Sequence, residues 1–115
     1  MTRGGDFIVE RMIDRGVTNA IGLCGHGNIG LLDALRTHSS EISTLSVHHE
    51  QASGHIADAF FRVTGRPAAT FTSCGPGSAN LPIALASAFY DRSAFLAITG
   101  NVPTSQFGKG AFQET

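Results

Sequence analysis

Charged residues, cysteines and long apolar runs are all scarce in this chain, and each shortage excludes a class of protein. Charged side chains make up 15% of the 115 residues and the formal net charge is -1, so the chain has no electrostatic footprint for nucleic acid. Two cysteines are too few for a disulfide scaffold or a zinc site. No stretch approaches the ~20 apolar residues of a membrane helix. What remains is a globular domain whose low charge suggests that another domain or subunit covers part of it.

Several familiar signatures are also missing. The sequence contains no Ser-His-Asp order, no Walker lysine motif and no CxxC. Residues 1–6 lack the apolar core of a secretory signal, so we expect a cytoplasmic location by default. Residues 111–115 follow a long loop and carry neither a polar tail nor a helix cap. We therefore expect a single domain, residues 1–115, cut from a longer multidomain protein.

The sequence does contain a regular alternation of helical and strand patterns. Helical spacing predicts helices over residues 6–15, 29–37 and 50–64, and another that begins after residue 80. Short apolar runs predict buried strands over residues 19–23, 42–47, 68–72 and 95–99. Because helices that alternate with strands form βαβ units, the fold class is α/β, a parallel sheet with helices on both faces. We expect the fold to be incomplete at its C-terminal end.

All four predicted helices carry apolar stripes, with Leu31, Leu32 and Leu35 inward in the helix over residues 29–37. The helix over residues 50–64 repeats Ala52, Ile56, Ala59, Phe60 and Val63 at helical spacing. The helix over residues 6–15 has Phe7, Ile8, Met12 and Ile13 near one face. In the helix after residue 80 we expect an inward stripe of Leu81, Ala84, Leu85 and Ala88.

Glu50 is the acidic residue with the clearest chemical role, because it follows the strand over residues 42–47 and opens the next helix. Open α/β sheets gather their ligands at the carboxyl ends of the strands. Burial favours the neutral form of a carboxyl group, so an acid at this edge can hold or share a proton near neutral pH. His48 and His49 precede it, but adjacent strand residues face opposite ways, so we do not expect them to share a metal ion.

Two glycine-rich turns lie at the same predicted edge. Gly25-His26-Gly27-Asn28-Ile29-Gly30 matches GxGxxG, follows a strand and opens a helix, and Glu50 stands at the distance of a ribose-binding acid. This pattern is typical of a dinucleotide-binding protein, although any tight βα turn also favours glycine. The second turn, Gly75-Pro76-Gly77, suits a polar or anionic ligand group ahead of a helix, or else allows two backbones to pack closely.

Cys24 and Cys74 end the first and third predicted strands. These strands are commonly neighbours in a doubly wound sheet, so one hypothesis places the two thiols close together at the ligand edge. The alternative is that small residues fit tight turns.

Five ordered segments carry a resemblance to a known family. They are His49-Glu50-Gln51-Ala52, residues 57–65, residues 72–80, Ile98-Thr99-Gly100 and Phe112-Gln113-Glu114. Together they resemble the N-terminal pyrimidine-binding domain of thiamine diphosphate enzymes, in the acetolactate synthase-like group. The resemblance covers essentially the whole chain and implies a Rossmann-like, thiamine diphosphate-binding fold.

The resemblance gives Glu50 a catalytic role. In such enzymes the glutamate of the His-Glu-Gln motif bonds N1′ of the aminopyrimidine and favours the 4′-imino tautomer, which removes the thiazolium C2 proton. His26 would lie near the thiazolium ring and act as an acid or base, and Phe112 and Gln113 would border the substrate pocket. The cofactor crevice would be shaped by Glu50, Gly25, Cys74, Gly75, Pro76, Gly77 and Asn80.

The same resemblance implies a lyase or carboligase that acts on 2-keto acids, with its active site between subunits of a homo-oligomer. Mg²⁺ and the diphosphate would be held by a separate C-terminal domain, so we expect no metal site in this chain and no activity from the fragment alone. Some acetolactate synthases also bind FAD through a middle domain, which makes FAD a further candidate cofactor.

Departures from the family pattern leave the substrate open. Acetolactate synthases usually have Pro-Gly-Gly where this chain has Cys24-Gly25-His26, arginine where it has His48, and serine where it has Cys74. The Gly-His-Gly-Asn turn is also similar to a thiamine-dependent hydrolase of a cyclic dione. A thiamine-dependent decarboxylase or such a hydrolase is therefore an alternative. Two further alternatives are a dinucleotide-binding module that uses Gly25–Gly30 and a non-catalytic domain that serves assembly.

Overall fold

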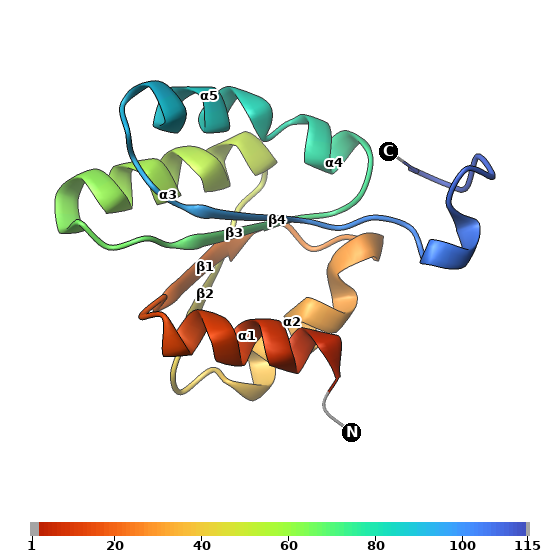
Figure 1. Cartoon of the computed structure of the whole chain (residues 1–115), viewed down its shortest axis with the longest axis horizontal. Helices are drawn as coiled ribbons and strands as arrows, with labels where there is room; N and C mark the ends of the chain where they lie inside the picture. Colours follow the sequence, from red (N-terminus) through yellow and green to blue (C-terminus); the bar gives the residue numbers. More distant parts are fainter. Residues whose placement is uncertain (1–2, 115) are drawn as a thin grey trace.

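The computed structural model describes residues 3–114, and a four-stranded parallel sheet forms its centre (Figure 1). The strands are β1 (Asn19–Gly22), β2 (Ser43–Ser46), β3 (Ala69–Thr72) and β4 (Leu96–Thr99). They lie in the order β2-β1-β3-β4, and every neighbouring pair is parallel. The predicted α/β class is confirmed, and β1 and β3 are neighbours, as the doubly wound pattern requires.

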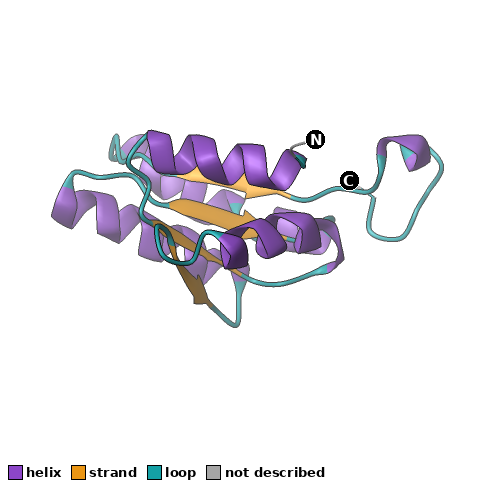
Figure 2. Ribbon diagram, turned by 90° about the horizontal axis from the view of Figure 1, so that it is seen from below, coloured by secondary structure: helices purple, strands orange, loops and turns teal. Residues whose placement is uncertain are grey.

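Helices cover both faces of the sheet. The pair α1 (Gly4–Asp14) and α2 (Ile29–Thr37) lies below the sheet in Figure 1, and α3 (Glu50–Thr64) and α5 (Pro82–Tyr90) lie above it. Three short helical turns, η1 (His26–Asn28), α4 (Pro76–Ala79) and η2 (Thr104–Gln106), belong to the loops. Figure 2 shows the segment after β4 extending beyond the carboxyl ends of the strands.

The ends of α3 explain why this helix has the predicted bounds. His49 is its N-cap, and the ring Nδ1 accepts a hydrogen bond from the backbone N–H of Gln51 at 3.2 Å. Gly65 follows the helix with φ +68°, the left-handed conformation that ends many helices at glycine. Glu50 is thus fixed as the first residue of α3, directly after β2 and its short connection.

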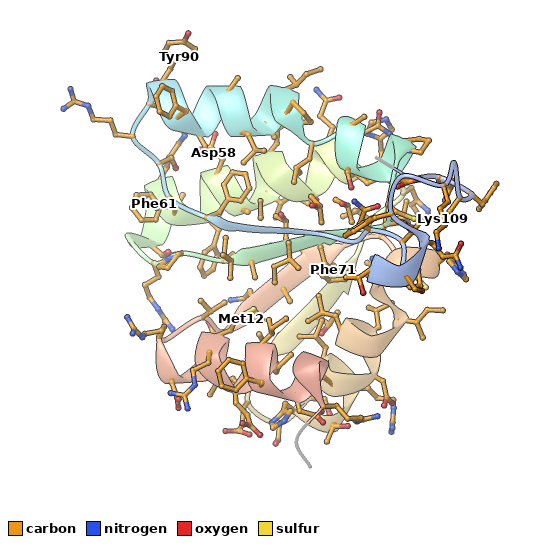
Figure 3. All side chains as sticks on the ribbon, turned by 45° about the vertical axis from the view of Figure 1, so that its right-hand side comes forward. Met12, Asp58, Phe61, Phe71, Tyr90 and Lys109 are labelled. Atoms are coloured by element: carbon orange, nitrogen blue, oxygen red, sulfur yellow. The ribbon has the colours of Figure 1, made fainter. Side chains whose placement is uncertain are left out.

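The core has two parts, one on each face of the sheet. Side chains of α1 and α2 pack with alternate residues of β1 and β3, and this part includes Met12 and Phe71, both labelled in Figure 3. On the other face, Ile21, Val47 and Ala57 form a smaller cluster. The alternation follows from the strand period of two, which sends neighbouring residues of a strand to opposite faces.

The predicted apolar stripes are partly wrong. In α3 the buried positions are Glu50, Ser53, Gly54, Ala57 and Asp58, whereas Val63 is 85% exposed and Ile56 is 38% exposed. In α5 the prediction holds for Leu81, Ala84 and Ala88, but Leu85 is exposed. Phe7 and Ile8 of α1 are also exposed, because Val9 and Met12 face the core.

The close contact between α3 and α5 gives the physical reason. A Cβ on Gly54 would lie 2.4 Å from the Cβ of Ala84, so the two helices meet through small residues. Small residues allow such an approach, which leaves the larger side chains on the outer surface. Phe89 and Tyr90 of α5 are about four-fifths exposed, at 78% and 82%, and Tyr90 projects away from the molecule in Figure 3.

The strand predicted over residues 42–47 is shorter and less buried than expected. All four residues of β2 are exposed, while Ile42 and Val47 at its two ends are buried. The reason is that β2 is an edge strand that no helix covers completely.

An ion pair ties the outer half of α3 to the residues after α5. Arg62 donates to both carboxylate oxygens of Asp58, at 2.9 and 2.8 Å, and to Asp91 at 2.6 Å. Asp58 is 5% exposed, and the Arg62 guanidinium lowers the pKa of its carboxyl group to about 2. The pair therefore fastens the α3–α5 layer at the end far from Glu50.

Among residues 3–114, no helix is both long and apolar enough to cross a membrane.

Candidate functional site

The candidate site lies where the loops after β1, β3 and β4 meet. A Cβ on Gly25 would lie 2.2 Å from the Cβ of Ser73, and one on Gly100 would lie 2.6 Å from the carbonyl oxygen of Gly27. Gly25 therefore packs against the Ser73 side chain and Gly100 against the backbone of Gly27, and a larger residue at position 25 or 100 would force the loops apart. This is the edge of the sheet at which the sequence predicts ligand binding.

Asn28 holds the first turn together, a role that the sequence interpretation missed. Its side chain is buried, and Oδ1 accepts from the backbone N–H of Gly25 at 3.0 Å. Nδ2 donates to the carbonyl of Leu23 at 2.9 Å. The available signal was the general habit of asparagine to bond nearby backbone in turns.

Two backbone amides of this turn donate hydrogen bonds to side chains of the protein. Gly25 N–H donates to Asn28, and Gly27 N–H donates to the Ser73 hydroxyl at 3.4 Å. A dinucleotide-binding turn offers its free amides to a pyrophosphate. The internal pairing of two of these amides disfavours the dinucleotide alternative for Gly25–Gly30.

Glu50 lies against the second glycine turn. Its carboxylate Oε2 accepts a hydrogen bond from Asn80 Nδ2 at 3.0 Å. Its other oxygen, Oε1, lies 3.0 Å from the place that a Cβ on Gly77 would occupy. The residue is 8% exposed, and its carbonyl accepts a hydrogen bond from the Ser53 hydroxyl at 2.6 Å. The glycine at position 77 thus leaves room beside Oε1.

The remaining glycine of this turn is explained by close packing with the C-terminal segment. Gly75 has φ +54°, and a Cβ there would lie 2.8 Å from the carbonyl oxygen of Gln113. The thiol of buried Cys74 lies 3.8 Å from Gln113 Oε1. These contacts favour the packing interpretation of Gly75-Pro76-Gly77 and bring Cys74, Gly75 and Gln113 together.

Glu114 organises the segment that carries Gln113, and the sequence interpretation assigned it no such role. Its carboxylate accepts hydrogen bonds from the backbone N–H groups of Gly108, of Gly110 at 2.9 Å and of Ala111 at 3.2 Å. These bonds lower the pKa of the Glu114 carboxyl group, and the bond from Gly108 has the largest effect. Lys109, labelled in Figure 3, lies on the loop that they close.

Other predicted residues are exposed at this edge. His26 lies in η1, and its ring makes no hydrogen bond to another residue in the described range 3–114. Phe112 is 78% exposed and Cys24 is also exposed. The proximity of the Cys24 and Cys74 thiols stays a prediction. Within the same range, no group of three or more His, Cys, Asp or Glu side chains is placed to hold a metal ion.

Comparison with known proteins points to one family. The family model described as "Thiamine pyrophosphate enzyme, N-terminal TPP binding domain" matches residues 2–115. The chain is 38% identical over 111 residues to the acetolactate synthase isozyme 1 large subunit of Escherichia coli, covering 96% of this chain and 20% of that protein.

Relatives from other organisms have similar sequence identities and cover similar shares of the chain. A probable acetolactate synthase large subunit of Methanocaldococcus jannaschii is 36% identical over 112 residues, which is 97% of this chain and 19% of that protein. The chloroplastic acetolactate synthase 2 of Nicotiana tabacum is 38% identical over 113 residues, 98% of this chain and 17% of that protein. The chain therefore spans about a fifth of the length of these relatives.

Proposed function

The chain belongs to the thiamine pyrophosphate enzyme family as its N-terminal TPP binding domain, and from this premise we propose that it forms the pyrimidine half of the active site of an acetolactate synthase-like enzyme. Residues 1–115 would be the N-terminal domain of a longer multidomain protein. The proposal is supported by the relatives, of whose length this chain spans about a fifth.

The position of Glu50 is the observation that carries the proposal. A carboxylate that is 8% exposed begins a helix at the carboxyl edge of the sheet, with one oxygen bonded to Asn80 and the other beside Gly77, which has no side chain to contact it. This arrangement fits a ring nitrogen that exchanges a proton with the carboxyl group. Glu50 would hold or release that proton, and burial would keep water away from it.

The other residues of the edge fit roles around this carboxyl group. Gly25, Cys74, Gly75, Pro76 and Asn80 would shape the crevice for the cofactor through their backbone and short side chains. His26, Phe112 and Gln113 would border the substrate. Bound thiamine diphosphate would supply the electron sink for reactions of 2-keto acids, while the protein supplies binding and orientation.

Assembly with other domains would complete the site. Mg²⁺ and the diphosphate would be bound outside this chain, by a further domain of a partner subunit. The outer surface of α3 and α5 supports such a covering partner, because Val63, Ile83, Phe89 and Tyr90 are exposed apolar or aromatic residues on it. A homo-oligomer of 2-keto acid carboligase subunits is the proposed form of the whole enzyme.

A titration of the full-length protein tests this proposal. Calorimetry with thiamine diphosphate and Mg²⁺, and separately with NAD, compares the two cofactor classes. Glu50→Gln is expected to slow C2 proton exchange of bound cofactor by at least ~100-fold, the scale of general acid–base catalysis. Glu10→Gln, an exposed acid of α1, is the matched control and should leave exchange unchanged. Binding of NAD without binding of thiamine diphosphate would contradict the proposal.

A further inference from the structure

The two carboxylate oxygens of Glu50 have different surroundings. Oε2 accepts a hydrogen bond from Asn80 Nδ2 at 3.0 Å. Oε1 lies beside Gly77, where even a methyl group would come within 3.0 Å. One oxygen is therefore held by a side-chain amide, and the other faces a residue without a side chain.

The chemistry of the two partners decides what each oxygen can do. An amide N–H group only donates, and an ionised carboxylate only accepts, so the Asn80 bond occupies Oε2 without supplying or removing a proton. The terminal torsion of a glutamate side chain is broad and roughly two-fold. A charge-assisted hydrogen bond to one oxygen therefore sets the plane of the carboxylate and determines which oxygen stays free.

The turn that carries Asn80 is itself well fixed. The backbone N–H of Asn80 donates to the carbonyl of Pro76 at 3.1 Å, and Ala79 N–H donates to Gly75 at 3.0 Å. The Ser78 hydroxyl donates to the carbonyl of Ser73 at 2.8 Å. Because these bonds tie the turn to the end of β3, Asn80 reaches Glu50 from a backbone that several independent contacts hold in place.

We propose that Asn80 is a positioning residue for Glu50: by holding Oε2, it makes Oε1 the oxygen that bonds the cofactor's pyrimidine and exchanges the proton there. The inference rests on the proposed function of Glu50 and adds the residue that orients it. Asn80 does not exchange the proton itself. Gly77 contributes because it has no side chain that would contact Oε1.

Two substitutions of similar size separate positioning from packing. Asn80→Leu keeps the branched skeleton of four side-chain heavy atoms and removes the donor, while Asn80→Asp places a second carboxylate next to Glu50, so the two must share a proton. In the full-length holoenzyme, Asn80→Leu should slow C2 proton exchange roughly 10- to 100-fold, the range for loss of a hydrogen bond to a charged group. Asn80→Asp should move the pH profile of exchange to higher pH. Ser39→Ala, at an exposed position after α2, should do neither.

A measurement without cofactor tests the contact directly. In protein labelled with ¹⁵N in asparagine side chains, the Asn80 amide signal is the one missing from Asn80→Leu. Its proton shift should move in Glu50→Gln and stay unchanged in Ser39→Ala. An Asn80 signal that is insensitive to Glu50→Gln would overturn the inference.

A double mutant separates failure of this inference from failure of the proposed function. With the inference correct, Glu50→Gln combined with Asn80→Leu exchanges no more slowly than Glu50→Gln alone, because Asn80 acts only through Glu50. If Glu50→Gln slows exchange but Asn80→Leu does not, or if the two effects multiply, the Asn80 inference fails and the proposed function stands. If Glu50→Gln leaves exchange unchanged, both the Asn80 inference and the proposed function fail.

Discussion

Gly54 of α3 and Ala84 of α5 lie in such close contact that a Cβ on Gly54 would sit 2.4 Å from the Cβ of Ala84. The same Cβ would also lie 3.0 Å from Leu81 Cδ1. The Cβ of Ala84 is attached directly to the backbone of α5, so it cannot rotate away to make room for a side chain at position 54. The spacing of the two helices above the sheet, and with it the position of Glu50 at the start of α3, therefore depends on the absence of a side chain at Gly54.

Gly54→Ala should destabilise the protein by roughly 1–3 kcal/mol, because overpacking outweighs the gain in helix propensity of about 1 kcal/mol. Urea unfolding followed by circular dichroism measures the change. Gly30→Ala in α2 is the control, because nothing lies within 4 Å of a Cβ there. That variant should stabilise by about 0.5–1 kcal/mol. Equal stabilisation by both substitutions would show that the helices are farther apart than described.

Gly77→Ala should weaken thiamine diphosphate binding by the full-length enzyme about tenfold, since small displacements of a catalytic group are costly. The added methyl group would lie 3.0 Å from Glu50 Oε1 and 3.7 Å from its carboxyl carbon. Calorimetric titration gives the affinity, and the melting temperature shows that the fold survives. Gly4→Ala is the control, because nothing lies within 4 Å of a Cβ there. An unchanged affinity for thiamine diphosphate in Gly77→Ala would show that Oε1 does not take part in binding it.

The Asp58–Arg62 pair should make stability depend on pH below about 4. The pKa of Asp58 falls from 3.8 to about 2 on folding, chiefly through its hydrogen bonds to Arg62. A lowered carboxyl pKa stabilises the fold above the unfolded value, on the order of 2 kcal/mol, and the stabilisation is lost as the pH falls through the folded value. Urea unfolding of Asp58→Asn and the parent protein between pH 6 and 2 measures this. The difference in unfolding free energy between the two proteins should shrink between pH 4 and 2. A constant difference would show that Asp58 does not have the lowered pKa.

Glu114→Gln should loosen the loop over residues 107–114. The Glu114 carboxylate bonds three backbone N–H groups of this loop, and those bonds lower its pKa. Glutamine keeps the shape but removes the charge, so trypsin should cleave after Lys109 several-fold faster. Acid should act in the same direction in the parent protein, because protonation of Glu114 removes the stabilisation below its ordinary pKa range. Glu41→Gln, in the connection between α2 and β2, is the control. Equal cleavage rates of Glu114→Gln and the parent protein would contradict the role of Glu114.

Local sequence patterns predicted the elements well because caps and periodicity act over a few residues. The observed bounds of α2 and α3 are the predicted ones, and the parallel sheet followed from the alternation of helices and strands. The faces of the helices were harder to predict, since hydrophobic spacing assumes that the largest apolar residues face inward. Gly54 reverses that assumption for α3, because it meets Ala84 of α5 while Ile56 and Val63 stay exposed.

The site was predictable only in part, for a similar reason. Glu50 could be placed at the sheet edge because it follows a strand and opens a helix. The bonds of Asn28, Asn80 and Glu114 could not be foreseen in the same way, because each joins a side chain to atoms whose positions depend on how the loops fold. For Asn80 the partner is thirty positions earlier in the chain.

The close contacts of Gly25 and Gly100 with neighbouring loops restrict which substitutions this edge of the sheet can accept. Gly25 and Gly100 each lie against a neighbouring loop with no space for a side chain, so substitution there would alter the frame of the site itself. His26 and Phe112 are exposed and adjoin that frame without supporting it. Divergence within such a domain can therefore replace exposed side chains such as those of His26 and Phe112 one at a time, while the packing of the loops around Gly25 and Gly100 stays the same.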